Sequence, residues 1–145
     1  GGQPARILTA SDTELLAVLP VSLPEGPAAI VVSHGGASSA PWLVPIARFA
    51  PVLLFALNED GDRNGEVAPA RVGSKLDLYL TGVRPGAVVE VRLHDRTSSA
   101  VCEESGQPGV HLVRLAVAQD LPSMQTAVTL TDGGVTSHPL DIWIQ

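Results

Sequence analysis

The sequence contains one cysteine (Cys102) and one lysine (Lys75) among its 145 residues. A single thiol excludes an internal disulfide, and the adjacent Glu103 and Glu104 disfavour the thiolate that a reactive cysteine needs. Basic residues number 9 against 15 acidic ones, with no basic cluster. Because nucleic-acid binding requires clustered Lys and Arg to neutralise phosphates, we expect no nucleic-acid partner.

Long apolar runs are also missing. The longest, residues 50–57, includes Pro51 and is far shorter than the roughly 20 residues that span a bilayer as a helix, so we expect no membrane insertion. Aromatic residues make up 3% and charged residues 17%, whereas hydrophobic residues reach 45%, with 14 Gly and 12 Pro. A chain this apolar and this weakly charged folds. Its composition indicates an all-β protein of short strands and tight turns.

An internal repeat organises the chain. Residues 23–47 align without gaps to residues 121–145, at an offset of 98 residues. Each copy contains an LP turn, a β-branched run, a Gly-Gly turn, a proline and a closing alternating run. The identical pairs are Leu23/Leu121, Pro24/Pro122, Ala29/Ala127, Gly35/Gly133, Gly36/Gly134, Ser39/Ser137, Pro41/Pro139 and Ile46/Ile144.

The alternation of apolar and polar residues predicts the strands. Apolar residues recur with a period of two in residues 76–80, 89–93, 113–117, 128–130 and 140–144, the period of a half-buried strand. No stripe with a helical period survives the Pro and Gly spacing. Regularly spaced strands favour an immunoglobulin-like β-sandwich over residues 50–145. Residues 1–49 then form a partial Ig-like repeat, containing only the last three or four strands.

Three segments carry a family resemblance. They are APVLLFALNEDGDRNGEVAPARVGSKLDLYLTGV (50–83), GVHLVRLAVAQDLP (109–122) and TAVTLTDGGVTSHPLDIWI (126–144). Together they resemble a bacterial immunoglobulin-like C-terminal domain family, present in many copies in large secreted or surface proteins of certain soil bacteria. One departure is that Arg84-Pro85 replaces the family's glycine-rich continuation. The resemblance implies an extracytoplasmic location, secreted or at the cell surface, and it implies no catalytic residues.

One segment of the sequence resembles an enzyme motif, the oxyanion loop of esterases. Ser33-His34-Gly35-Gly36 follows an apolar strand, as the HGG loop of an α/β-hydrolase does. The sequence contains no G-x-S-x-G nucleophile elbow, however, and the repeat has Asp132 where His34 stands. A turn explains the glycines better, and we expect the protein not to be an enzyme.

Residues 60–65, DGDRNG, match the first half of an EF-hand loop. The twelfth position, which supplies the bidentate acid, is Arg71. A plain Asp/Asn/Gly turn is therefore the better interpretation. No cofactor is expected, apart from a weak calcium site on Asp60, Asp62 and Asn64 that stays open as a hypothesis.

The two tryptophans differ in their expected environments. Alternation places Trp42 with Val44 and Ile46 on an inward face, which predicts a core residue, and it places Trp143 outward. Because an exposed indole stacks on sugars and anchors protein interfaces, Trp143 and Tyr79 are the candidate binding residues. Packing of Trp143 against a loop or the preceding half-unit is the alternative.

Together these features predict a non-catalytic structural or adhesive module that spaces or presents other domains, or mediates protein association. Its expected partners are other protein domains or a second copy of itself. The alternative function is a carbohydrate-binding module, with polysaccharide as ligand, or an accessory module of a secreted hydrolase.

Overall fold

The computed structural model describes residues 2–145. In that range the regular secondary structure consists of β-strands without a helix, and every pair of named strands is antiparallel. This confirms the all-β prediction. In the described part of the chain, no helix is long and apolar enough to cross a membrane. The chain divides into two compact units, with the boundary between Arg48 and Phe49.

The N-terminal unit contains three separate strand pairs, β1 with β2, β3 with β6, and β4 with β5. Its strands are β1 (Arg6–Ala10), β2 (Leu15–Val18), β3 (Gly26–Ile30), β4 (Ser33–His34), β5 (Ala37–Ser38) and β6 (Trp42–Ile46).

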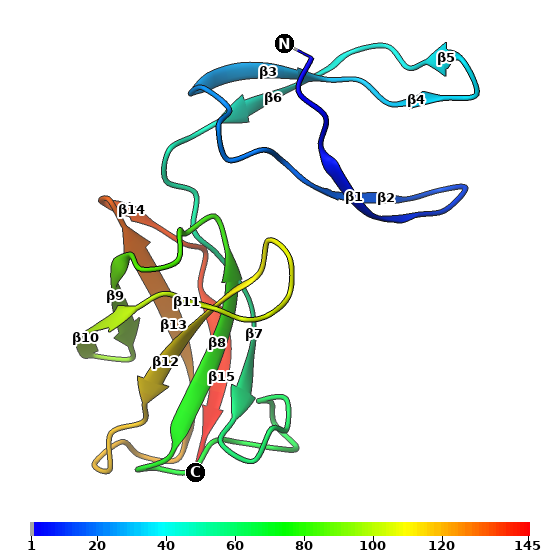
Figure 1. Ribbon diagram of the computed structural model, residues 1–145. Helices are drawn as coiled ribbons and strands as arrows, with labels where there is room; N and C mark the ends of the chain where they lie inside the picture. The colour runs from blue at the N-terminus through cyan, green and yellow to red at the C-terminus, as the bar shows by residue number, and fades with distance from the viewer. Residues whose placement is uncertain (1) are drawn as a thin grey trace. The chain divides into compact units, whose positions relative to one another are not determined.

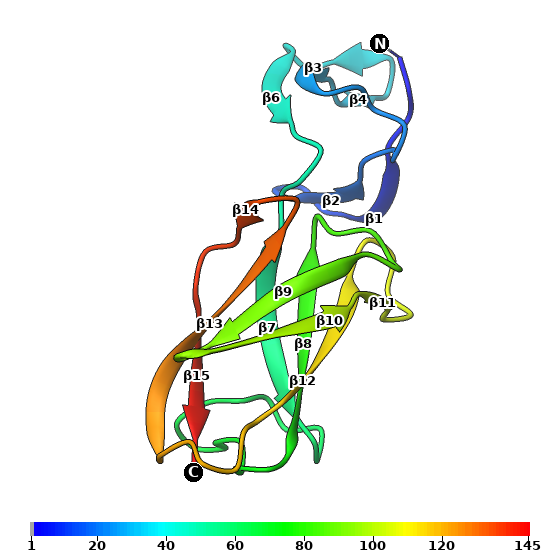
Figure 2. The same cartoon turned by 90° about the vertical axis from the view of Figure 1, so that its left-hand side faces the viewer.

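The C-terminal unit contains two larger sheets (Figures 1 and 2). The first has the strand order β11-β12-β8-β7, and the second has the order β10-β9-β13-β14, with β15 also paired to β13. The strands are β7 (Val52–Asn58), β8 (Lys75–Thr81), β9 (Val88–Leu93), β10 (Arg96–Val101), β11 (Glu103–Glu104), β12 (His111–Ala116), β13 (Met124–Asp132), β14 (Val135–Thr136) and β15 (Leu140–Ile144).

A single hydrophobic core joins the two sheets of this unit. Its fully buried members include Leu78 on β8 and Val113 on β12 from one sheet, and Val91 on β9 and Leu130 on β13 from the other. The predicted alternation is visible along β9, where Val89, Val91 and Leu93 are buried and the residues between them are exposed. Burial of each such aliphatic side chain stabilises the fold by roughly 1.5–3 kcal/mol.

The N-terminal unit has no comparable core, because none of the residues 2–48 is buried. Yet its last four strands reproduce the pairing of β13, β14 and β15 residue for residue at the repeat offset. Ile30 pairs with Trp42 as Val128 pairs with Leu140, and Gly26 pairs with Ile46 as Met124 pairs with Ile144. The hairpins repeat as well, since Ser33 pairs with Ser38 as Thr131 pairs with Thr136.

Side-chain hydrogen bonds also repeat. The backbone N–H of Val32 donates to Ser39 Oγ at 3.1 Å, and the N–H of Leu130 donates to Ser137 Oγ at the same distance. Each of these hydroxyls donates in turn at 2.9 Å to the carbonyl of the following residue. The offset of 98 residues therefore describes two copies of one local structure.

The Gly-Gly dipeptides form tight hairpin turns in both copies. Gly35 and Gly36 have φ values of 58° and 81°, and Gly133 and Gly134 have 56° and 83°. Two successive positive φ values define the type I′ turn that suits the twist of a two-residue hairpin. The SHGG segment thus forms β4 and the turn that joins it to β5, and its His34 is exposed.

The prediction that Trp42 is a core residue is wrong, because its exposed fraction is 73%. Trp42 stands at the repeat position of Leu140, and Val44 and Ile46 stand at those of Ile142 and Ile144, which are buried. Alternation predicted the correct face of the strand. In the C-terminal unit that face is buried in the core shared with the other sheet, whereas residues 2–48 contain no equivalent of β7 to β10.

Two side-chain substitutions at equivalent repeat positions test whether only the C-terminal unit has a packed core. We expect Leu130→Ala to lower the free energy of unfolding by about 2–5 kcal/mol, because it opens a cavity in a packed core. Val32→Ala, at the repeat position, removes a side chain that is 44% exposed and is expected to cost less than about 0.5 kcal/mol. Urea denaturation is followed by Trp143 fluorescence in a Trp42→Phe background. Equal losses in the two variants would contradict the assignment of the core to the C-terminal unit alone.

Candidate functional site

A shallow groove runs beside Trp143 in the C-terminal unit. It has a volume of about 340 Å³ and lies where β7, the loop after it and β15 meet. Phe55, Arg63, Leu140, Asp141 and Trp143 contribute to its lining. Because Ile142 and Ile144 are buried in the core, the alternating Asp141 and Trp143 face away from it, as predicted. Trp143 is half-buried rather than fully exposed.

Phe55 connects this groove with the second candidate residue, Tyr79. The two rings stack across β7 and β8 with centroids 4.7 Å apart and planes inclined by 13°. The guanidinium carbon of Arg63 lies 5.4 Å from the centroid of Phe55, a cation–π geometry. Phe55 contacts Tyr79 and also lines the groove beside Trp143. Phe55 and Arg63 are the residues of this surface that the sequence analysis did not single out.

Asn64 holds the backbone of Trp143 in place. The Trp143 N–H donates to Asn64 Oδ1 at 2.9 Å, and Asn64 Nδ2 donates to the Trp143 carbonyl at 2.9 Å and to Asn58 Oδ1 at 2.9 Å. Asn58 is itself buried and donates to the Ala68 carbonyl at 2.8 Å. This amide network fixes the loop after β7 against the edge of β15.

The loop then continues along β15. The Ala70 N–H donates to the Trp143 carbonyl at 2.8 Å, the Gln145 N–H donates to the Ala70 carbonyl at 2.8 Å, and the Val72 N–H donates to the Gln145 carbonyl at 2.9 Å. The bridge between Ala70 and Ile144 is parallel. The outer edge of β15 is therefore covered, as stable sheets require of their edges.

The three residues of the calcium hypothesis lie in this loop but use their oxygens differently. Asp60 Oδ1 accepts the Asp62 N–H at 3.2 Å in a turn, and Asn64 Oδ1 accepts the Trp143 N–H. No group of three or more His, Cys, Asp or Glu residues that could hold a metal ion occurs within residues 2–145. The role that the structure gives to Asn64 is to position Trp143.

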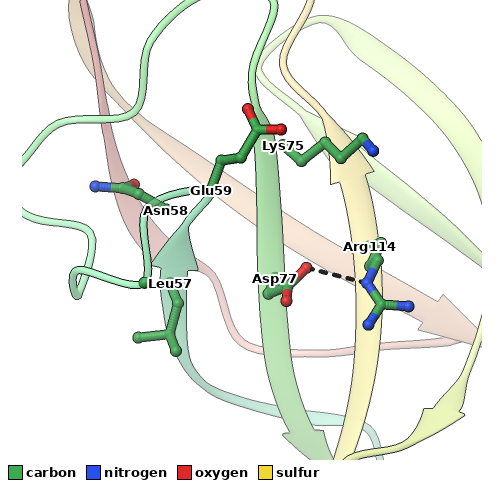
Figure 3. Close-up of a pocket in the computed structure, with 7 residues that line it drawn as sticks. Leu57, Asn58, Glu59, Lys75, Asp77 and Arg114 are labelled. Carbon is green, nitrogen blue, oxygen red and sulfur yellow. Dashed lines mark ion pairs between the residues drawn. The ribbon is translucent and has the colours of Figure 1, made fainter.

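A second groove, of about 230 Å³, lies on the sheet that contains β7, β8 and β12, and the charged Glu59, Lys75, Asp77 and Arg114 contribute to its lining. Figure 3 shows Asp77 of β8 directed at Arg114 of β12, with Lys75 and Glu59 nearby. The Arg114 Nε atom lies 3.5 Å from Asp77 Oδ1, and its Nη1 lies 2.5 Å from Glu103 Oε2. All three side chains are partly exposed. Such surface ion pairs each contribute about 0–1 kcal/mol.

Cys102 is buried in the hydrophobic core and is followed in the chain by the exposed Glu103 and Glu104. Burial, followed by the negative charges of Asp132, Glu104 and Glu103, raises the pKa of its thiol to about 11. The thiolate is therefore scarce at neutral pH, which agrees with the expectation from the adjacent glutamates.

Comparison with known proteins gave no match to a family model, to a curated protein or to a solved structure.

The amide network gives a direct test of how Trp143 is positioned. In Asn64→Asp the new carboxylate still accepts from the Trp143 N–H, but it cannot donate to the two carbonyl oxygens that Asn64 Nδ2 serves. We expect the free energy of unfolding to fall by about 1–3 kcal/mol at pH 7. The loss should shrink at pH 3–4, where the introduced carboxyl becomes protonated and donates.

The matched control is Asp60→Asn, whose side-chain oxygen still accepts from the Asp62 N–H, and we expect a change within about 0.5 kcal/mol. Urea denaturation at both pH values measures each effect. A loss in Asn64→Asp that does not depend on pH would contradict the donor role of Asn64 Nδ2.

Proposed function

We propose that the chain is a non-catalytic immunoglobulin-like module of an extracytoplasmic protein, which spaces or presents neighbouring domains or mediates protein association. The strand order supports the fold. The order β7-β8-β12-β11 corresponds to A-B-E-D of an Ig domain, and β9-β13-β15 corresponds to C-F-G. Residues 49–145 have about the length of one such domain.

The observation that carries the spacer function is the position of the two ends of the C-terminal unit. β7 begins at one end of this unit and the C-terminus lies at the opposite end (Figures 1 and 2). A module with its ends at opposite poles extends a chain by its own length. The internal repeat supports a tandem arrangement of such modules, because residues 26–46 repeat the structure of residues 124–144.

Mechanical unfolding of the full chain, held between two handle proteins, tests the spacer function. Pulling along the strands loads the β7–β8 and β13–β15 hydrogen bonds together, since these bonds lie perpendicular to the strands. We expect one discrete unfolding step that releases about 300 Å of chain from residues 49–145. Residues 2–48, which have no core, should extend at low force without a step. Gradual extension of the whole chain would contradict the proposal.

Carbohydrate binding is the second candidate function, and the stacked Phe55 and Tyr79 rings, Arg63 and the half-buried Trp143 favour it. Indole and phenyl faces stack on sugar rings, and guanidinium and carboxylate groups bind hydroxyls. An accessory module of a secreted hydrolase would use the same surface.

Binding to insoluble cellulose, chitin and xylan, measured by co-sedimentation, tests this candidate. If the groove binds one of them, we expect Trp143→Ala to weaken binding about tenfold, a loss equivalent to roughly 1.4 kcal/mol. Trp42→Ala, which changes the other tryptophan, serves as the control and should leave binding unchanged. Failure of the unmodified chain to bind any of the three would exclude them as ligands.

A further inference from the structure

The loop after β7 contains the dipeptide Asn64-Gly65, in which the asparagine side chain is open to an intramolecular reaction. Asparagine is among the thermolabile residues, because the backbone nitrogen of the next residue can attack the carbon of its side-chain amide. Glycine at the next position has no Cβ atom to hinder that approach. Asn58, the other asparagine of the chain, is followed by the bulkier Glu59. The sequence therefore distinguishes Asn64 chemically from Asn58.

In the folded chain, hydrogen bonds engage both groups that would react. The Asn64 side chain makes three hydrogen bonds of 2.9 Å, two with the backbone of Trp143 and one with Asn58 Oδ1. The Gly65 N–H donates to the Ala68 carbonyl at 3.1 Å. The side-chain amide cannot turn toward the Gly65 nitrogen without losing its bonds to Trp143. The reaction therefore requires the loop to separate from β15.

We propose that Asn64 is a deamidation site that the folded loop keeps unreactive, and that its reaction permanently weakens the attachment of the loop to β15. When the loop opens, hydroxide removes the Gly65 N–H proton and the nitrogen attacks Asn64 Cγ. The N–Cγ bond forms, the Cγ–Nδ2 bond breaks, and ammonia leaves after taking up a proton from water. A second water molecule then hydrolyses the cyclic imide to an aspartate or an isoaspartate at position 64. Water is consumed, hydroxide is regenerated, and nothing is oxidised or reduced.

Neither product restores the original contacts. A carboxylate at position 64 still accepts from the Trp143 N–H, but it has no hydrogen to donate to the Trp143 carbonyl or to Asn58 Oδ1. The Trp143 carbonyl then keeps only the bond from the Ala70 N–H. In the isoaspartate product the main chain also runs through the former side chain, which displaces the carboxylate. Since ammonia has left, the change is irreversible.

The structure also provides a control substitution, Gly65→Ala. Gly65 is not among the glycines with positive φ, and nothing lies within 4 Å of a Cβ atom added to it. An alanine is therefore compatible with the native loop. Its methyl group hinders the attack on Asn64 Cγ once the loop is open. This variant separates the chemical reaction from the folding of the loop.

Incubation of the full chain at mildly alkaline pH, with and without denaturing urea, tests the site and its protection. Mass spectrometry of proteolytic peptides locates the deamidated residue. We expect Asn64 to react, and at least about tenfold more slowly in the native chain than in urea, because the reaction waits for the loop to open. Asn58 should stay intact over the same period, and Gly65→Ala should suppress the reaction in urea.

Refolding of the reacted chain tests the structural consequence. After removal of urea, we expect the denaturation midpoint to lie at a lower urea concentration than in the unreacted chain, as in Asn64→Asp. Amide exchange of Ala70, Val72 and Gln145 should be faster, because their hydrogen bonds join the loop to β15. The Gly65→Ala chain, treated in the same way, should recover its original midpoint.

Three results would overturn the proposal. Equal reaction rates in the native and the unfolded chain would mean that the folded loop does not protect Asn64. Faster reaction at Asn58 than at Asn64 would assign the site to the wrong residue. An unchanged midpoint and unchanged amide exchange in the fully deamidated chain would mean that the attachment of the loop does not depend on the Asn64 amide.

Discussion

The apolar face of a strand pair in this protein is buried only where a second sheet packs against it. In the C-terminal unit, β8, β9, β12 and β13 supply each other's cover, and the central leucines and valines lose all contact with water. Local pairing alone does not achieve this, because β3 and β6 have the same register as β13 and β15 and bury nothing fully. Pairing is thus a local property of these strands, and the core depends on non-local packing.

The loop after β7 links the core with the candidate surface. Asn58 and Asn64 join this loop to the backbone of Trp143, and residues 70–72 cover the outer edge of β15. The same contacts hold Trp143 beside Phe55 and Arg63. The acidic, glycine-rich loop therefore has a structural role at the end of the last strand, and the stacked rings lie on the surface that it organises.

Periodicity and turn chemistry predicted much of this fold. The period of two in residues 89–93 and 140–144 identified strands and their buried faces, and Gly133-Gly134 identified a hairpin. Burial was less predictable, because alternation shows which side chains share a face of the strand and does not show whether another sheet packs against that face. Trp42 was assigned to the correct face and is nevertheless exposed.

The candidate surface was only partly predictable for a similar reason. Trp143 and Tyr79 were identified by their side-chain chemistry, but Phe55 lies beside Tyr79 through the pairing of β7 with β8, which is shifted in register between Leu53 and Phe55. Arg63 and Asn64 reach the groove through a loop whose path depends on side-chain amides. No local pattern encodes such contacts over a separation of 79 residues.

Amide hydrogen exchange of the unmodified chain tests whether these strands are stabilised by packing against a second sheet and not by local strand pairing. The decisive comparison is between residues 26–46 and residues 124–144, which have matched registers. We expect protection near the global limit for the buried part of β13 and β15, and exchange at least about a hundredfold faster in β3 and β6. Equal protection of the two copies would contradict this expectation, because the N-terminal strands would then be stable without the core that their repeat partners share.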